Sequence, residues 1–321
     1  MVRDFWRDLK GTITASAPMA GVTDAAFREM LARYGKPDVI WTEMVSVAGI
    51  RVRGEENFEN EMKFSFREKP VVLQFFGADP RDFLMCGEIA ERRGFDGMDI
   101  NMGCPDQGVE KQGAGACLIK SPTLAREILS AAKEGSGGLP VSVKTRLGYS
   151  KRSEMEKWFE AIASEAPAAI TIHGRTRSER RKGSADWKAV GEAGKIVKGV
   201  NKKIVILGNG DVLSKEDGEE RTKDAGLDGY MVGRALIGDP WFFTGKEALR
   251  PERIRAAAEH AVLFEKIYGE TEPFDLMKNH LAGYMGGFDG AKELRVRMMA
   301  AKNAKDITNI AEGEGVLDLN I

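Results

Sequence analysis

Short apolar runs alternate with helical patterns along most of this chain, and this alternation limits the folds that it can adopt. Eight runs read as strands, and segments with helical periodicity lie between them. The predicted strands cover residues 12–20, 38–43, 70–76, 95–101, 139–145, 168–173, 203–209 and 228–233. Between two of them, residues 79–94 read as a helix with Pro80 in its first turn and Gly94 closing it. Eight strands alternating with helices by about residue 245 predict an α/β fold, a (β/α)8 TIM barrel, with a doubly wound open sheet as the alternative.

The strand pattern stops after residue 243, and only helical patterns follow. Residues 252–270 and 274–312 read as amphipathic helices joined by turns that contain glycine or proline. We therefore expect a barrel over residues 1–245 and a small, all-helical C-terminal domain over residues 246–321.

Composition narrows the class of protein. Of 321 residues, 42% are apolar and 30% are charged, which is typical of soluble globular proteins. No apolar run approaches the roughly 18 residues of a membrane span, and the first residues lack the apolar stretch of a secretory signal. The three cysteines have no CxxC spacing, so neither a disulfide framework nor a zinc site is indicated. We expect a reduced, cytoplasmic enzyme, a monomer without a metal or membrane partner.

The charge is balanced overall but unevenly distributed. The formal net charge is −1, whereas residues 175–182 and residues 278–305 each carry a local charge of +4. Such runs usually lie on solvated faces. Local basic patches can nevertheless attract a polyanion when the total charge is close to zero.

Polar residues gather at the predicted carboxyl ends of the strands, where the active site of an α/β barrel lies. Reading the strand ends in order, polar residues included, gives Pro18, Met19, Ala20, Glu43, Gln74, Asn101, Cys104, Lys144, His173, Asn209, Gly210, Asp211, Gly233 and Arg234. Taken singly, Gln74 could cap a turn, His173 could be a satisfied core histidine, and Lys144 could reach from a strand end to solvent. Their shared position at the strand ends favours one common site.

The last two strand ends fit a phosphate. "GNGD" and "VGRA" are glycine-bearing turns whose backbone N–H groups can hold an anion, and Arg234 adds a cation. Lys144 would stabilise negative charge on a bound ring, and the amide of Gln74 suits an imide-like ring edge. A phosphate at one end and such a ring at the other describe FMN.

Six motifs carry a family resemblance: "APMAGVTDAAFR", "DINMGCP", "VKTRLG", "IHGRTR", "GNGDV" and "VGRALIGDPW". In this order they resemble the tRNA-dihydrouridine synthases, over about residues 12–245, and the helical tail resembles that family's RNA-binding domain. The resemblance implies FMN-dependent reduction of particular uridines in tRNA to 5,6-dihydrouridine, with NADPH or NADH supplying the electrons.

The resemblance also assigns roles by motif. It implies that FMN is held by Pro18, Met19, Ala20, Gln74, Lys144, His173, Asn209, Gly210, Asp211, Gly233 and Arg234. It places Asn101 and Cys104 against the uracil, with hydride delivered to C6 and the Cys104 thiol protonating C5. The target base has to leave its stack to reach the barrel mouth. We expect contacts to tRNA phosphates from Arg175, Arg177, Lys278, Arg295 and Arg297, whereas Cys86 and Cys117 should be packed hydrophobes.

One stretch departs from the family pattern. After "HGRTR" many members have Gln and then an aromatic residue before Gly-x-Ala-Asp-Trp, but here Glu179 and Arg181 stand at those two places. We expect the flavin contacts to be unaffected by this departure. The identity of the recognised uridine stays open.

Three other functions remain open from the sequence. A flavin barrel that acts on a small molecule, as dihydroorotate or enoate reductases do, would not need the basic tail. A non-redox phosphate-binding barrel would be colourless when purified. A catalytically silent RNA-binding module would not need both Cys104 and Lys144.

Overall fold

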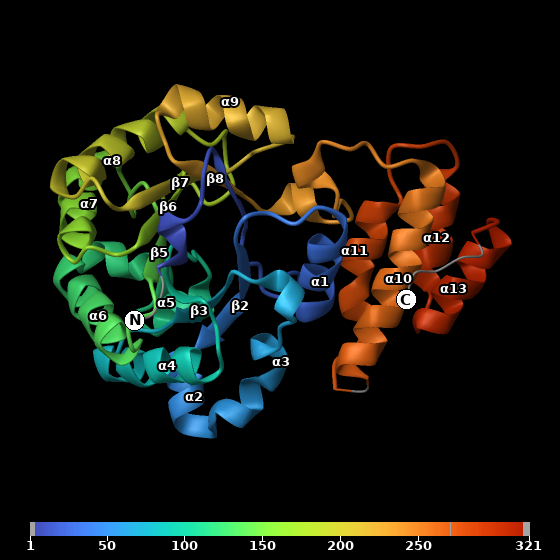
Figure 1. The fold of residues 1–321 in the computed structure, drawn as a ribbon, viewed down its shortest axis with the longest axis horizontal. Coiled ribbons are helices and arrows are strands. Elements are labelled where there is room, and N and C mark those ends of the chain that lie inside the picture. Colours follow the sequence, from blue (N-terminus) through green and yellow to red (C-terminus); the bar gives the residue numbers. More distant parts are fainter. Residues whose placement is uncertain (1–3, 270, 317–321) are drawn as a thin grey trace.

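Eight parallel strands form the centre of the computed structural model, which describes residues 4–269 and 271–316 (Figure 1). The strands are β1 (Ile13–Ser16), β2 (Ile40–Ser46), β3 (Val71–Phe76), β4 (Gly97–Met102), β5 (Val141–Arg146), β6 (Ala169–His173), β7 (Val205–Asn209) and β8 (Gly229–Val232). Their order in the sheet is β1-β8-β7-β6-β5-β4-β3-β2. Each overlaps a predicted strand, so the strand prediction is confirmed.

The sheet closes between β1 and β2 through a short backbone contact. Ala15 and Val39 form a parallel bridge, in which Ser16 N donates to Val39 O at 3.1 Å. The Asp38 carboxylate adds hydrogen bonds from the backbone N–H and the hydroxyl of Thr14, both at 2.8 Å. This contact joins the two edges of the sheet, so the barrel, and not the open doubly wound sheet, is the fold.

Helices surround the barrel. They are α1 (Ala25–Tyr34), α2 (Val47–Arg53), α3 (Glu59–Met62), α4 (Pro80–Arg92), α5 (Gln107–Lys111), α6 (Pro122–Gly135), α7 (Met155–Ser164), α8 (Trp187–Val200) and α9 (Lys215–Ala225). Helix α4 lies within the predicted range 79–94, because Asp79 caps it through Arg81 N and Gly94, with a φ of +77°, follows its last turn. The apolar faces of α4, α6, α7 and α8 pack against the outside of the sheet in one continuous core.

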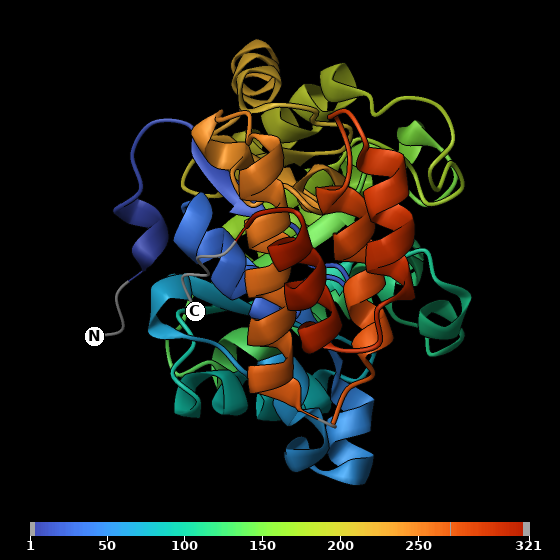
Figure 2. The ribbon, with the colours of Figure 1, turned by 90° about the vertical axis from the view of Figure 1, so that its right-hand side faces the viewer.

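The C-terminal segment is helical, as predicted, and packs against one side of the barrel (Figures 1 and 2). It contains α10 (Arg250–Tyr268), α11 (Met277–Tyr284), α12 (Ala291–Ala300) and α13 (Ala304–Gly313). Ala25, Ala26 and Met30 of α1 share a buried core with these four helices. Helix α11 also contacts the chain after β8 backbone to backbone, because a Cβ atom on Gly283 would lie 2.4 Å from Ile237 O. No helix in the described part of the chain is long and apolar enough to cross a membrane.

Two buried histidines lie at the contact between the barrel and the tail. The His280 ring stacks on Phe27 of α1 and lies 4.7 Å from the His260 ring, centroid to centroid. His280 Nε2 is 3.0 Å from Val22 O, in the loop between β1 and α1, and the Tyr284 hydroxyl is 3.3 Å from His260 Nδ1. Burial lowers the pKa of His280 to about 4 and that of His260 well below its usual range, so both are neutral at pH 7.

This burial predicts an acid-sensitive stability. An unfolded histidine has a pKa of about 6.5, so its unfolded form gains a proton below that pH while folded His280 stays neutral. His280 alone should therefore remove about 2 kcal/mol from the free energy of unfolding between pH 7 and pH 5. Urea titrations at both pH values should show a smaller loss for His280→Phe than for the parent. Equal losses would mean that His280 is not buried as a neutral ring.

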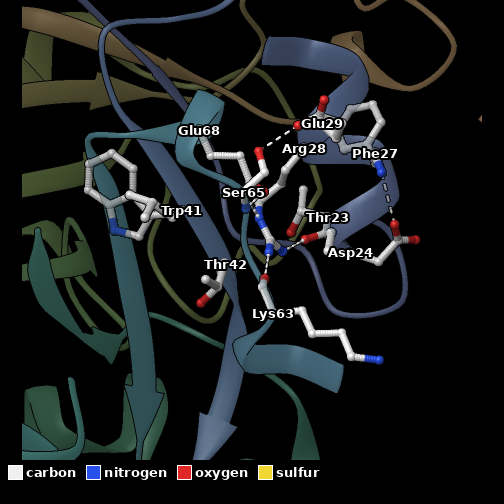
Figure 3. Close-up of polar contacts among 12 residues, drawn as sticks. Thr23, Asp24, Phe27, Arg28, Glu29, Trp41, Thr42, Lys63, Ser65 and Glu68 are labelled. Carbon is white, nitrogen blue, oxygen red and sulfur yellow. Dashed lines mark hydrogen bonds and ion pairs between the residues drawn. The ribbon is translucent and has the colours of Figure 1, made fainter. Parts of the chain in front are cut away.

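A second buried polar cluster fixes the start of α1 (Figure 3). Arg28 Nε donates to Glu68 Oε2 at 2.6 Å, and its other nitrogens donate to Thr23 O and Lys63 O. Both side chains are fully buried, with exposures of 0% and 1%. Asp24 caps the helix by accepting from Phe27 N at 2.9 Å. The cluster joins the loop after β1 to the segment before β3.

Candidate active site

A cavity of about 480 Å³ opens at the carboxyl ends of β1 and β5 to β8. It brings together nine of the predicted cofactor residues: Pro18, Met19, Lys144, His173, Asn209, Gly210, Asp211, Gly233 and Arg234. Two others, Ala20 and Gln74, are not among its lining residues. The ends of five strands therefore converge on this cavity, whereas Gln74, Asn101 and Cys104, at the ends of β3 and β4, are outside its lining.

Positive charge dominates the lining of this cavity. Its cations are Lys144, Arg146, Arg175, Arg180, Arg181 and Arg234, and Asp211 is the carboxylate among the described lining residues. Arg146, Arg180 and Arg181 were not predicted here. Strand alternation could have found Arg146, because residues two apart on a strand share a face and Lys144 was already assigned. Such a lining suits an anionic ligand.

Asp211 organises the phosphate-like end of the cavity. Its carboxylate accepts from Ala185 N at 2.8 Å and pairs with both Arg175 and Arg234. Asp211 has a φ of +54°, and Gly210 before it has a φ of +118°, so the turn after β7 has the unusual backbone that the "GNGD" motif allows. Asn209 holds the next strand end by donating to Met231 O at 2.8 Å.

The arginines predicted to contact RNA near this mouth lie in different environments. Arg175 is 3% exposed and donates to Asp211 and to Gly183 O, so we assign it to the cavity wall instead of the RNA surface. Arg177 is partly buried, pairs with Glu110 at 2.8 Å and lies over the Tyr149 ring. A basic run in a sequence does not reveal which of its members are buried, which is why Arg175 was misplaced.

Lys144 and His173 line the cavity from the neighbouring strands β5 and β6. Burial, aided by Arg146, lowers the pKa of Lys144 to about 8, and its Nζ donates to Asn209 Oδ1 at 3.2 Å. Burial and four nearby cations hold the pKa of His173 well below its usual range, so the ring is neutral. His173 Nδ1 is buried without a hydrogen-bond partner among the described residues. A buried polar atom of this kind is expected to meet a ligand or water.

Gln74 belongs to a polar network inside the barrel. Its Nε2 donates to Asp99 Oδ2 at 2.7 Å, and its Oε1 accepts from Asn101 Nδ2 at 2.9 Å. Asp99, which was not predicted, also accepts from the Ser142 hydroxyl at 2.6 Å, and burial raises its pKa to about 6. An acidic residue in the middle of an apolar strand was the signal that could have identified it.

Asn101 fixes the position of Cys104. Its Oδ1 accepts from Gly103 N at 3.1 Å and from Cys104 N at 2.9 Å. On the other side, Cys104 O accepts from Ala116 N at 3.0 Å. Gly115 has a φ of +62°, and a Cβ there would lie 2.7 Å from Cys104 O, so glycine is required for this close packing. The loop thus presents Cys104 in a defined conformation.

The three cysteines differ in environment. Burial raises the pKa of the half-buried Cys104 thiol, so the thiol carries its proton at neutral pH. Cys86 is fully buried in α4, as predicted for a packed hydrophobe. Cys117 is half-buried in a 3-10 turn (Gly115–Lys120), so it is less enclosed than predicted. No group of acidic, histidine or cysteine side chains that could hold a metal occurs among the described residues.

The predicted RNA contacts of the tail all have protein partners. Lys278 pairs with Asp275 at 2.7 Å, Arg297 pairs with Glu314, and Arg295 Nε donates to Met285 O at 3.0 Å. Arg295 and Arg297 are nevertheless exposed on α12. These three basic residues of the tail therefore have partners within the protein, and Arg295 and Arg297 remain open to solvent.

Comparisons with known proteins extend these observations. The sequence model of the family described as Dihydrouridine synthase (Dus) matches residues 15–318. The probable tRNA-dihydrouridine synthase 2 of Bacillus subtilis (strain 168) is 34% identical over 311 residues, which are 96% of this chain and 95% of that protein. The probable tRNA-dihydrouridine synthase of Staphylococcus aureus (strain COL) is 33% identical over 99% of this chain and 96% of its own length.

A solved structure shares the fold. Histamine dehydrogenase from Rhizobium sp. 4-9 superposes with a TM-score of 0.53 at 14% sequence identity, over 78% of this chain and 48% of that one. The chain thus spans about half the length of that dehydrogenase. At this identity the likeness concerns the fold alone.

Proposed function

The chain belongs to the dihydrouridine synthase family, whose members are oxidoreductases that act on uridines in tRNA, and we propose that it reduces such uridines to 5,6-dihydrouridine with FMN and NAD(P)H. One observation supports this proposal above the others: a cationic cavity and the Cys104 loop lie at the same mouth of the barrel. With FMN in the cavity, an anionic redox cofactor would lie beside Cys104, the proposed proton donor.

The residues of the cavity fit FMN. Arg234 and the turns at Asn209, Gly210 and Gly233 would hold its phosphate, since glycine-bearing turns after the last two barrel strands are suited to phosphate. The ammonium of Lys144 and the unpartnered Nδ1 of His173 would contact its polar ring edge. When bound, FMN supplies the hydride that uracil C6 receives.

The side chains of the protein would supply the proton and would hold the proton donor in place. Reduction of the C5=C6 bond takes one hydride at C6 and one proton at C5. The protonated Cys104 thiol would deliver that proton. Asn101 would keep that thiol in place through its two backbone hydrogen bonds. The uracil has to be turned out of the tRNA stack to reach the mouth.

A direct experiment tests this function. The purified protein should be yellow, release FMN on denaturation, and form dihydrouridine in unmodified tRNA when NADPH or NADH is added. Mapping dihydrouridine across tRNAs from a strain that lacks the gene would identify the modified positions. A yellow protein that interconverts orotate and dihydroorotate, or reduces an enoate, but leaves tRNA unchanged would favour the small-molecule flavin enzyme instead. A colourless protein would exclude both.

Lys144 provides a prediction on the cofactor side. Lys144→Ala should weaken FMN retention or slow flavin reduction and reoxidation, because it removes an ammonium from the part of the cavity assigned to the ring. Lys144→Arg, which keeps the charge, is the matched control. Flavin content and stopped-flow absorbance measure both effects. An alanine variant that retains FMN and turns over like the parent would refute this role.

The basic residues of the tail provide a prediction on the RNA side. Affinity for tRNA should fall steeply with salt, and each lost phosphate contact among Lys278, Arg295 and Arg297 should lower the slope of log affinity against log salt by roughly one unit. Arg126→Ala is a suitable control, because Arg126 lies on α6 of the barrel, outside the tail, and pairs with Glu165. Normal binding by charge-reversed tail variants would remove these residues from the RNA surface.

A further inference from the structure

The loop between β6 and α8, residues 174–186, is held against the barrel by two buried arginines. Arg146 donates to Thr176 O and to Arg180 O, both at 3.2 Å, and also to Gly103 O at 2.6 Å. Arg175 holds the far side of the loop through Gly183 O at 2.5 Å. Arg180 itself has a φ of +51°, a left-handed conformation that costs a residue with a side chain on the order of 1 kcal/mol. The loop is therefore fixed in an uncommon shape.

This shape places Arg180 and Arg181 in the lining of the cavity. Both are exposed, and neither side chain has an ion pair or hydrogen bond with another described residue. Leu213, on the loop after β7, lines the same cavity and is 77% exposed. Two unpaired cations and an uncovered apolar side chain thus share one rim.

The charge of the cavity exceeds what one flavin would neutralise. The six lining cations face one carboxylate, Asp211, which leaves a charge of +5. A phosphate monoester brings about −2. One further negative charge on a ring beside Lys144 would still leave two positive charges. Arg180 and Arg181 are the two cations whose guanidinium groups have no partner in the described chain.

We propose that Arg180 and Arg181, with Leu213 beside them, form a subsite for a phosphate of a second ligand that enters after the flavin is in place. The inference rests on the proposed function, since that reaction brings two further phosphate-bearing ligands to this mouth. One is the nicotinamide dinucleotide, which differs between NADPH and NADH by one phosphate. The other is tRNA, whose backbone phosphates flank the target nucleotide. Leu213 offers an apolar contact for the nucleoside attached to that phosphate.

The test compares Arg180→Ala/Arg181→Ala with Lys182→Ala, which removes an exposed charge from the same loop outside the cavity lining. Three quantities are measured for both variants and the parent: FMN content, the concentration dependence of flavin reduction by NADPH and by NADH without tRNA, and tRNA affinity as a function of salt. Arg180→Lys/Arg181→Lys, which keeps both charges, checks that any loss reflects charge and not misfolding.

The outcomes separate the two sources of the phosphate. The subsite is assigned to the dinucleotide if the NADPH concentration for half-maximal flavin reduction rises about tenfold or more while the corresponding NADH concentration is unchanged. Unchanged NADPH kinetics with at least tenfold weaker tRNA binding and a lower salt slope assigns it to RNA. Loss of FMN from the alanine variant alone, or no change in any quantity, would overturn the proposal. A parent protein without flavin would instead refute the proposed function.

Discussion

Replacing Cys104 with alanine is expected to lower the rate of dihydrouridine formation by about 10²–10⁴-fold, the usual contribution of a positioned general acid. FMN content and flavin reduction by NADPH should stay those of the parent, because Cys104 is outside the lining of the cationic cavity. Single-turnover assays with prereduced enzyme and unmodified tRNA measure the affected step directly.

The other two cysteines are the matched controls. Cys86→Ala and Cys117→Ala should keep activity, since Cys86 is buried in α4 and Cys117 lies in the turn after the loop. The pH profile adds an independent check: the pKa of Cys104 is raised, so the protonated thiol should persist at neutral pH and be lost only at alkaline pH. Equal losses in all three variants, or an active Cys104→Ala enzyme on native tRNA, would contradict the assignment.

Replacing Arg28 with leucine should lower the free energy of unfolding by about 3–5 kcal/mol, the usual cost of removing one partner from a buried ion pair. The substitution would leave the Glu68 carboxylate buried without its counter-ion, and Thr23 O and Lys63 O without their donor. Denaturant titration at pH 7 measures the change.

A double variant separates the ion pair from simple packing. Arg28→Leu/Glu68→Leu should recover part of the lost stability, because no unpaired charge then remains buried. Arg81→Ala, which removes an arginine that is 89% exposed and paired with Asp79, should leave the free energy of unfolding almost unchanged, because solvent screens an exposed ion pair. A loss for Arg28→Leu as small as that of Arg81→Ala would mean that the cluster contributes little.

The strands and α4 could be predicted because their signals are local. Apolar runs bounded by turns, Pro80 at the first turn and Gly94 after the last turn are each read within a few residues. The same holds for the strand-end residues of the cavity, since a parallel barrel carries every carboxyl end to the same mouth.

The composition of the cavity wall could not be predicted in full, because it depends on contacts between distant segments. Arg180 and Arg181 reach the lining only because Arg146, 34 residues earlier in the chain, holds the carbonyl of Arg180. Arg175 looked like one more member of a basic run, and its burial follows from Asp211, 36 residues away. Gln74 was assigned to the cofactor, yet its amide contacts Asp99 and Asn101 inside the barrel.

The contact between α1 and the tail has a consequence for how the molecule could be divided. A chain shortened to residues 1–245 would uncover Ala25, Ala26 and Met30 and lose the Tyr268 hydroxyl, which accepts from Ala25 N at 2.8 Å. It would also lose the contact of His280 with Val22, in the loop that carries Pro18 and Met19 to the cavity. The barrel is therefore expected to depend on the tail for its own cooperative folding, so that removal of the tail abolishes flavin binding as well as RNA binding.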